Sequence, residues 1–245
     1  MSRPLVLRAP AKLTLTLRVT GRRPDGYHLI AADMVTLGLH DVLTVDPDGE
    51  GISVSGPYSR GVPTDGTNIV AHALALVGRR AHIHIDKHIP HGGGLGGGSA
   101  DAAAVLRWAG YTDVAGAAAI GADVPFCLVG GSARVSGIGD LVEPTNHADQ
   151  TFTLVIPPLA CPTAEIYRAW DAAGGPVGDH GNDLEPSALL VVPELAEWRD
   201  RITAATGTRP RLAGSGSTWF LDGRYDGLAD RLAGAHVVVT RTDRP

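Results

Sequence analysis

The sequence is poor in cysteine and has no long apolar run. Its two cysteines, Cys127 and Cys161, lack the neighbouring Cys and His spacing of a zinc site, and two thiols cannot form a disulfide framework. No stretch approaches the roughly 20 apolar residues of a membrane helix, and residues 1–10 lack the apolar core of a secretion signal. We therefore expect buried free thiols and a cytoplasmic protein without a membrane partner.

Positive charge is also scarce. The chain carries 21 Lys and Arg against 26 Asp and Glu, a formal net charge of −5, and contains no run of basic residues. Binding to a nucleic-acid backbone requires clustered Lys or Arg, so we expect no nucleic-acid partner. Only two of the basic residues are lysines, Lys12 and Lys87, which makes each of them a candidate for a specific role.

The periodicity of apolar residues indicates a mixture of strands and helices. At 245 residues the chain is long enough to bury a large core, and its elements do not alternate strictly as strand and helix, which favours an α+β fold. A polar loop is expected at residues 20–26, a turn at 123–129, and a weak domain boundary at 144–150. We predict strands at residues 5–19, 27–39, 41–45, 52–54, 82–86, 132–135, 152–156, 211–212, 218–221 and 236–240, and helices at 68–77, 100–106, 115–120, 164–173 and 193–205.

Glycine is abundant, and the densest glycine segment is the strongest functional signal. After a predicted strand, residues 90–103 read Pro-His-Gly-Gly-Gly-Leu-Gly-Gly-Gly-Ser-Ala-Asp-Ala-Ala and pass into a strong helix former. Glycines let backbone N–H groups converge on one anion, and a helix N-terminus adds about half a positive charge there. A flexible linker would not end in such a helix with Ser99 at the capping position. The segment therefore predicts a phosphate-binding loop.

Two other kinds of phosphate loop fit less well. The spacing Gly92-x-Gly94-x-x-Gly97 formally matches a dinucleotide fingerprint, but it is a lone match inside a glycine run, and the chain lacks repeated βαβ units. A Walker loop is excluded because no Gly-Lys pair occurs anywhere in the sequence.

Three further motifs occur in order along the chain. Residues 9–15 read Ala-Pro-Ala-Lys-Leu-Thr-Leu and lead to Gly-Arg-Arg-Pro-Asp-Gly-Tyr-His at 21–28; residues 121–126 read Gly-Ala-Asp-Val-Pro-Phe, and 213–218 read Ala-Gly-Ser-Gly-Ser-Thr. Together with the glycine loop they resemble the superfamily of galactokinase, homoserine kinase, mevalonate kinase and phosphomevalonate kinase (GHMP). Within it, Leu95 and the doubled glycines resemble the diphosphocytidyl methylerythritol kinase branch. The resemblance extends from residue 9 to about residue 221.

This resemblance implies a fold and a reaction. The fold is an α+β, two-lobed small-molecule kinase, with a ribosomal-protein-S5-like lobe at residues 1–146 that carries the ATP loop and a ferredoxin-like α/β lobe at 147–245. The reaction is transfer of the ATP γ-phosphate, with Mg²⁺, to the 2-hydroxyl of 4-diphosphocytidyl-2-C-methyl-D-erythritol in the non-mevalonate pathway of isoprenoid precursor synthesis. The partner would be this small molecule, and the protein a monomer or homodimer. The alternatives are a kinase for another small alcohol, a non-catalytic nucleotide-binding homologue and, more distantly, a NAD-dependent oxidoreductase.

The resemblance also assigns two catalytic residues. Asp123 would accept the proton of the acceptor hydroxyl, and Lys12 would pair with Asp123 and with the transferring phosphate. Taken alone, Asp123 before Val-Pro could stabilise a turn, and Lys12 in a strand could lie on a solvated face.

The remaining assignments concern binding. Thr14 stands where the branch commonly has Asn, and Ala100 where it has a second Ser, while no metal ligand is assigned. On the residues alone, Tyr27 would read as a core residue at the start of a strand, and the Gly-Ser-Gly of 214–216 as a turn. The resemblance assigns Pro90, His91, Gly92, Gly93, Gly94, Leu95, Gly96, Gly97, Gly98, Ser99 and Ala100 to ATP, and Thr14, Tyr27, His28, Thr163, Gly214, Ser215 and Gly216 to the substrate.

Overall fold

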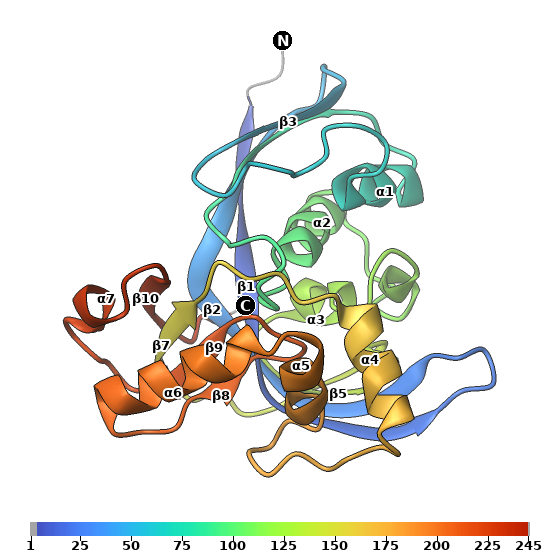
Figure 1. The fold of residues 1–245 in the computed structure, drawn as a ribbon. Coiled ribbons are helices and arrows are strands. Elements are labelled where there is room, and N and C mark those ends of the chain that lie inside the picture. Colours follow the sequence, from blue (N-terminus) through green and yellow to red (C-terminus); the bar gives the residue numbers. More distant parts are fainter. Residues whose placement is uncertain (1–3, 245) are drawn as a thin grey trace.

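Two β-sheets form the framework of the protein. The computed structural model describes residues 4–244, so residues 1–3 and 245 of the predicted domain ranges lie outside it. A long antiparallel hairpin of β1 (Leu5–Arg22) and β2 (His28–Asp46) runs through the molecule (Figure 1). The two predicted strands at 27–39 and 41–45 are thus one continuous strand.

Strand β2 exchanges partners along its length. One edge pairs with β1 throughout, whereas the other edge pairs first with β5 (Ser132–Gly137) and then with β4 (His82–Asp86). Between these two ladders lies Asp41, whose side chain is fully buried. The sheet is completed by β3 (Gly51–Ser55), which is parallel to β4, and β6 (Leu141–Pro144), which is antiparallel to β5.

Helices pack on this first sheet. Helix α2 (Gly97–Trp108) contacts β1 and β2, and α1 (Ile69–Leu76) packs on α2 (Figure 1). Asn68 caps α1, because its side-chain oxygen accepts a hydrogen bond from the Val70 N–H at 2.8 Å. A 3-10 turn at Gly116–Ala119 and helix α3 (Val124–Val129) follow.

The second sheet has four antiparallel strands in the order β10-β7-β9-β8. Because side chains alternate along a strand, its two faces pack into different cores. Phe152 and Leu154 join the core of the first sheet, whereas Val155 and Trp219 pack with the C-terminal helices. The strands are β7 (Thr151–Ile156), β8 (Arg211–Leu212), β9 (Trp219–Asp222) and β10 (His236–Arg241), and the helices are α4 (Thr163–Ala172), α5 (Glu185–Val191), α6 (Glu194–Thr206) and α7 (Leu228–Arg231).

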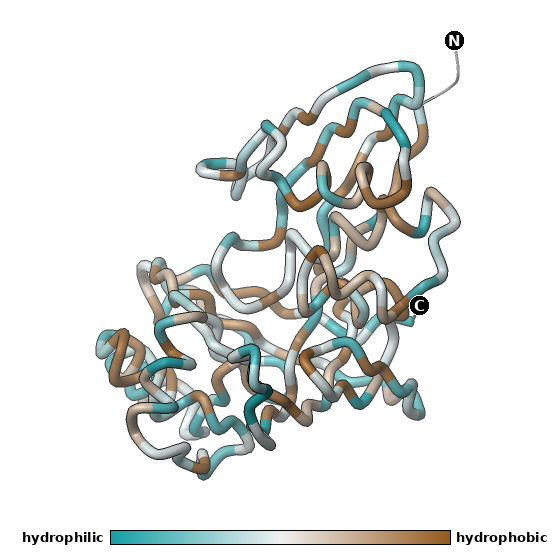
Figure 2. Tube along the Cα trace, turned by 90° about the vertical axis from the view of Figure 1, so that its right-hand side faces the viewer, coloured by the Kyte–Doolittle hydropathy of each residue, from teal (hydrophilic) through white to brown (hydrophobic). Residues whose placement is uncertain are grey.

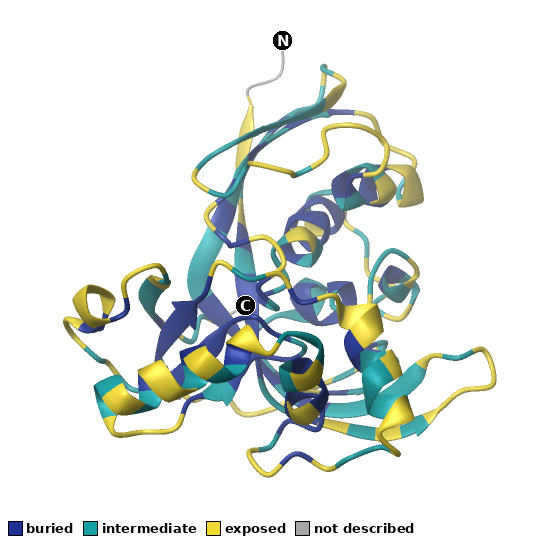
Figure 3. Cartoon of the chain, in the orientation of Figure 1, coloured by how far each residue is buried: buried dark blue, intermediate teal, exposed yellow. Residues whose placement is uncertain are grey.

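Burial follows this layering. Dark-blue, buried segments of β1, β2 and α2 lie at the centre in Figure 3, and exposed residues lie on the outer sides of the helices and in the loops. In Figure 2 apolar residues (brown) and hydrophilic residues (teal) alternate along much of the chain. Both cysteines are free and buried, as expected, and burial raises the pKa of Cys127 to about 12 and that of Cys161 to about 11.

The α+β fold class is confirmed, with corrections in detail. The turn predicted at 123–129 is wrong: α3 forms there because Pro125 is tolerated in a first helical turn, and Val124 and Phe126 are buried. The predicted cap at Ser99 is also wrong, since left-handed Gly96 caps α2 and Ser99 lies inside its first turn. Strand β6 and helices α5 and α7 were not predicted. The domain boundary at 146 stays a prediction.

No helix among residues 4–244 combines the length and the apolar character that crossing a bilayer requires.

A buried asparagine joins segments from both ends of the chain. The Asn182 amide donates to the carbonyl oxygens of Leu212 at 2.9 Å and Gly214 at 2.7 Å, and its oxygen accepts from Leu184 N–H at 3.0 Å. Its backbone also forms a β-bridge with Leu17 of β1. Asn182 therefore fixes the turn at 214–216 relative to the first sheet.

We expect Asn182→Ala to lower the free energy of unfolding by about 2 to 4 kcal/mol, because two buried carbonyl groups lose their donors. Urea denaturation would measure this loss. Exposed Asn146→Ala is the control and should change stability by less than about 0.5 kcal/mol. Equal stability of the two variants would contradict the assignment.

Candidate active site

A cavity of about 800 Å³ lies where the β1–β2 hairpin, the glycine loop, the start of α3, helix α4 and the turn at 214–216 meet. Its volume falls in the usual range for small-molecule sites, about 300 to 1,000 Å³. Most residues assigned from the sequence come together here, although they span more than 200 positions of the chain. Those lining it are Lys12, Thr14, Tyr27, His28, Gly92, Gly94, Ser99, Asp123, Thr163, Gly214, Ser215 and Gly216.

The other predicted loop residues do not line this cavity. Leu95 and Ala100 are buried, with exposed fractions of 1% and 0%, so their side chains belong to the protein interior. Ala100, at the position where a second Ser was expected, therefore faces the core. The full set that does not line the cavity is Pro90, His91, Gly93, Leu95, Gly96, Gly97, Gly98 and Ala100.

Lys12 is held at the cavity wall by contacts of both its side chain and its backbone. Its Nζ lies 3.2 Å from Asp123 Oδ2 and donates to Thr14 Oγ1 at 3.1 Å. The register of the β1–β2 ladder shifts just before Lys12, and its N–H donates to the Leu95 carbonyl at 3.0 Å. With only 5% of its surface exposed, Lys12 is not a solvated strand lysine. The pair joins a buried cation to a partly exposed carboxylate.

The glycine loop is tied to both parts of the structure. The Leu95 carbonyl accepts from the Lys12 N–H, as described above, and the Gly93 carbonyl accepts from the Thr218 N–H at 3.2 Å. Gly96 adopts the left-handed conformation at φ 67° and is the N-cap of α2. The first N–H groups of a helix have no intrahelical acceptor, so the start of α2 presents donors suited to phosphate.

The two glycine-rich motifs approach each other closely. Gly94 has φ 76°, and a Cβ atom built on it would lie 2.6 Å from the Ala213 oxygen and 2.8 Å from the Gly216 oxygen. No side chain fits there, which explains why this loop position is a glycine. Gly92 has a similar φ of 73°, but a Cβ there would meet nothing within 4 Å.

One wall of the cavity is aromatic. The His28 ring stacks on Tyr167 with centroids 4.6 Å apart, and its Nε2 lies 2.8 Å from Asp171 Oδ1. Tyr27 lies at the rim and is 62% exposed, so the interpretation as a core tyrosine is wrong. Sequence reasoning missed Tyr167 and Asp171. Their i, i+4 spacing places both on one face of a predicted helix. The sequence did not indicate that this helix contacts the hairpin.

Across the cavity, Thr163 and Ser215 share a hydrogen bond of 2.8 Å between their hydroxyl groups. This contact connects the start of α4 with the second glycine motif, two segments that sequence reasoning had assigned separately to the substrate.

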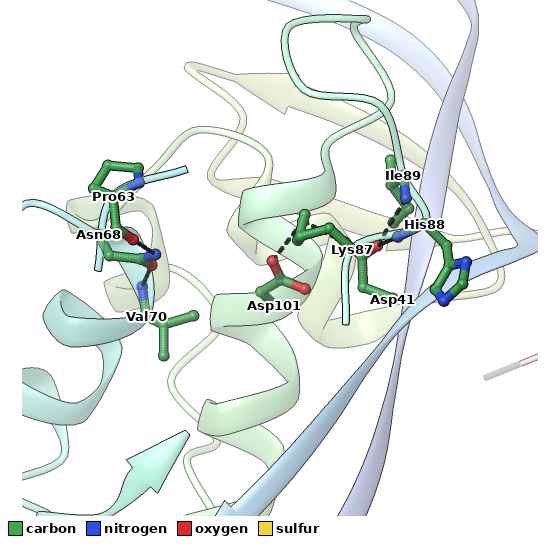
Figure 4. Close-up of polar contacts among 8 residues, drawn as sticks. All are labelled: Asp41, Pro63, Asn68, Val70, Lys87, His88, Ile89 and Asp101. Atoms are coloured by element: carbon green, nitrogen blue, oxygen red, sulfur yellow. Dashed lines mark hydrogen bonds and ion pairs between the residues drawn. The ribbon is translucent and has the colours of Figure 1, made fainter. Parts of the chain in front are cut away.

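The second lysine lies behind the glycine loop rather than in the cavity. Figure 4 shows Lys87 between Asp41 and Asp101; its Nζ donates to Asp41 Oδ2 and, at 2.7 Å, to Asp101 Oδ2. Asp41 Oδ1 also accepts from the N–H groups of His88 at 2.5 Å and Ile89 at 2.7 Å. The cluster therefore joins β2, the segment that enters the glycine loop, and the helix that leaves it.

One ammonium group cannot compensate two buried carboxylates equally. Asp41 accepts two backbone N–H groups in addition to Lys87, whereas Asp101 Oδ1 has no hydrogen-bond partner among residues 4–244. Desolvation, opposed by Lys87 and reinforced by Asp41, raises the pKa of Asp101 to about 8. Burial thus disfavours the ionised form of the Asp101 carboxyl.

Comparison with known proteins bears on the family and the fold. The family model described as GHMP kinases N terminal domain matches residues 68–131, which include the glycine loop and Asp123. The mevalonate kinase of Methanococcus jannaschii shares the fold, with a TM-score of 0.61 at 13% identity, covering 99% of each chain. The fold and the site define a kinase of the GHMP class, an ATP-dependent phosphotransferase for small molecules.

Closer relatives narrow the family. The 4-diphosphocytidyl-2-C-methyl-D-erythritol kinase of Dinoroseobacter shibae is 37% identical over 98% of this chain and 92% of its own. That of Paracoccus denitrificans is also 37% identical, over 86% and 84%. A crystal structure of 4-(cytidine 5'-diphospho)-2C-methyl-D-erythritol kinase superposes with a TM-score of 0.78 at 32% identity, covering 98% of this chain and 100% of that one. The chain belongs to the 4-diphosphocytidyl-2-C-methyl-D-erythritol kinase family.

Gly94→Ala and Gly92→Ala form a matched pair, because both place a side chain at a similar positive φ, at a cost of about 1 to 2 kcal/mol. Only Gly94→Ala also collides with the second glycine motif. We expect it to raise the KM for ATP at least about 10-fold more than Gly92→Ala, equivalent to about 1.4 kcal/mol. Initial rates of ADP release across an ATP titration would measure this, and equal effects would argue against the close approach.

Asp101→Asn should flatten the pH dependence of stability. Because the pKa of Asp101 is raised in the folded protein, the unfolded chain loses this proton near pH 4 and the folded protein only near pH 8. The folded state binds more protons between these values, so this group makes stability fall as pH rises from about 4 to about 8.

Urea denaturation of the wild type and of Asp101→Asn across that pH range would test the prediction. Surface Asp226→Asn serves as the control and should keep the wild-type slope. An unchanged slope in Asp101→Asn would show that Asp101 is ionised in the folded protein.

Proposed function

We propose that the protein transfers the γ-phosphate of ATP to the 2-hydroxyl of 4-diphosphocytidyl-2-C-methyl-D-erythritol, a step of the non-mevalonate route to isoprenoid precursors. The observation that carries this proposal is the 3.2 Å pair of Lys12 and Asp123 at the wall of a cavity that also holds a glycine loop and an aromatic surface. Binding a nucleotide alone would not require a carboxylate at this position.

The chemistry follows from the pair. The acceptor oxygen forms a bond to the γ-phosphorus as the bond to the β–γ bridging oxygen breaks, and the hydroxyl proton passes to the Asp123 carboxylate. An alcohol is too weak an acid to ionise beforehand, and a positioned base typically contributes about 10² to 10⁴ in rate. Lys12 pairs with the carboxylate and offsets negative charge on the transferring phosphate. Thr14, hydrogen-bonded to Lys12, limits how that ammonium can turn.

The ATP phosphates would lie at the start of α2, where loop N–H groups and the helix dipole favour negative charge. Mg²⁺ commonly binds through one or two carboxylates together with nucleotide phosphates, whose charge it neutralises. The Ser99 hydroxyl lines the cavity and would hold that ion together with the ATP phosphates.

The cytidyl group would lie at the aromatic end. Tyr27 and Tyr167 offer flat surfaces for stacking on a base, and His28 offers polar edge groups. The turn at 214–216 and the Thr163–Ser215 hydroxyl pair line the same cavity and would hold the diphosphate. A kinase for another small alcohol is the second candidate, because Thr14 stands where a longer Asn was expected.

Three further expectations remain predictions: a cytoplasmic location, a monomeric or homodimeric state, and the absence of a nucleic-acid partner.

Asp123→Asn should lower kcat at least about 10²-fold with an unchanged KM for ATP, because the amide keeps the size of the carboxylate but accepts no proton. ADP release with Mg-ATP and saturating cytidyl substrate would measure this. Asp25→Asn, which changes a carboxylate elsewhere in the cavity, is the matched control and should retain kcat. Unchanged turnover in Asp123→Asn would remove this residue from the mechanism.

The same assay with mevalonate, homoserine or no acceptor tests the substrate. Turnover that depends on the cytidyl compound supports the proposal. Turnover with a different alcohol would favour the second candidate.

A further inference from the structure

The aromatic wall is assembled from two segments that lie far apart in the sequence. His28 begins β2 in the first sheet, whereas Asp171 lies in the last turn of α4, 143 positions later. Their contact of 2.8 Å is supported by the stacking of His28 on Tyr167 and by the edge of Trp170, whose ring centroid lies 5.8 Å from that of His28. The imidazole is therefore held on both its face and one nitrogen.

The second oxygen of Asp171 is also engaged. Arg22 Nη1 lies 3.4 Å from Asp171 Oδ2, and its Nε donates to the Gly26 carbonyl at 3.3 Å across the tip of the hairpin. Arg22 thus keeps the carboxylate oriented so that Oδ1 faces His28. A carboxylate oxygen only accepts hydrogen bonds, so His28 Nε2 must carry the proton in this contact.

A neutral imidazole has one donor and one acceptor nitrogen. In this neutral form, with the proton on Nε2, Nδ1 is the acceptor, and it makes no hydrogen bond with any residue between 4 and 244. The side chain of His28 retains 11% exposure and lines the cavity. The wall therefore presents a fixed acceptor beside flat aromatic surfaces.

We propose that Asp171 is a specificity-determining residue, which holds His28 as a hydrogen-bond acceptor and thereby selects a cytosine base over uracil. This inference rests on the proposed function. At position 4, cytosine carries an amino group that donates hydrogen bonds, whereas uracil carries a carbonyl oxygen that only accepts them. The acceptor nitrogen of His28 would pair with the amino group of cytosine, but it would face the lone pairs of the carbonyl oxygen of uracil. Asp171 touches no reacting atom and is a positioning residue.

The contact between His28 and Asp171 does more than hold α4 against the hairpin. A tether would be satisfied by the Arg22–Asp171 ion pair alone, and both partners of that pair are partly exposed, where ion pairs contribute little to stability. The His28 contact instead fixes the identity of the group that faces the cavity. Sites that hydrogen-bond a substrate group discriminate strongly because a mismatched ligand leaves that group unpaired.

Binding of CDP and UDP, measured by calorimetry, tests the proposal without turnover. We expect the wild type to prefer CDP by at least about 10-fold, and Asp171→Ala to lose most of that preference through weaker CDP binding. Asp171→Glu should restore part of it. Glu165→Ala, which removes an exposed carboxylate from the same helix, is the matched control and should keep the wild-type preference.

Two further readouts separate a positioning role from a structural one. In Asp171→Ala the KM for the cytidyl substrate should rise about 10-fold or more, while kcat and the KM for ATP stay within about 3-fold. Nitrogen-15 NMR of the wild type should show His28 with a proton on Nε2 and none on Nδ1. A proton on Nδ1 would overturn the proposal.

The outcomes also distinguish this inference from the proposed function. If the wild type turns over the cytidyl substrate and Asp171→Ala keeps the preference for CDP, the role of Asp171 is wrong and the function stands. If the wild type binds CDP and UDP equally yet phosphorylates the cytidyl compound, the inference also fails alone. If the wild type neither binds CDP nor uses the cytidyl substrate, both fail together.

Discussion

The ammonium of Lys12 lies inside the protein, where a charge is costly unless it is paired. Asp123 and Thr14 satisfy its side chain, and its backbone N–H binds the Leu95 carbonyl. One residue of β1 thus joins the start of α3 to the glycine loop. These contacts hold the Asp123 carboxylate and the glycine loop close to β1.

The second constraint is the close approach of the two glycine motifs. Gly94 faces the carbonyl oxygens of Ala213 and Gly216 at distances that admit no side chain. Asn182 holds the far motif by donating to the Gly214 carbonyl and is bridged through its backbone to β1. The part of the site built by the second sheet is therefore fixed to the part built by the first. Placing a phosphate chain between Lys12 and the aromatic wall requires such a fixed distance.

Because lysine occurs only twice in the sequence, Lys87 was a candidate for a specific role, but the sequence did not indicate which role. Its scarcity marked it for attention, but its partners lie 46 positions before it and 14 after it. Asp41 is buried because β2 changes partners around it, a feature of the sheet and not of local composition. The cluster supports the glycine loop from behind, whereas Lys12 lies at the cavity. Of the two lysines in the sequence, one therefore supports the loop and the other lines the cavity.

Local chemistry was sufficient to predict much of this protein. The glycine run followed by a helix former indicated a phosphate loop, because that signal depends on neighbours in the chain. The family and the pair of Lys12 and Asp123 were implied by the resemblance of four ordered motifs to known kinases. Local rules failed where packing decided: the segment after Asp123 forms a helix because its apolar residues find a core, and Gly96 caps α2 in place of Ser99. The contact of Asp171 with His28 could not be predicted from the sequence either. It exists only because the second sheet carries α4 against the hairpin, and contacts between distant segments are set by the packing of whole elements.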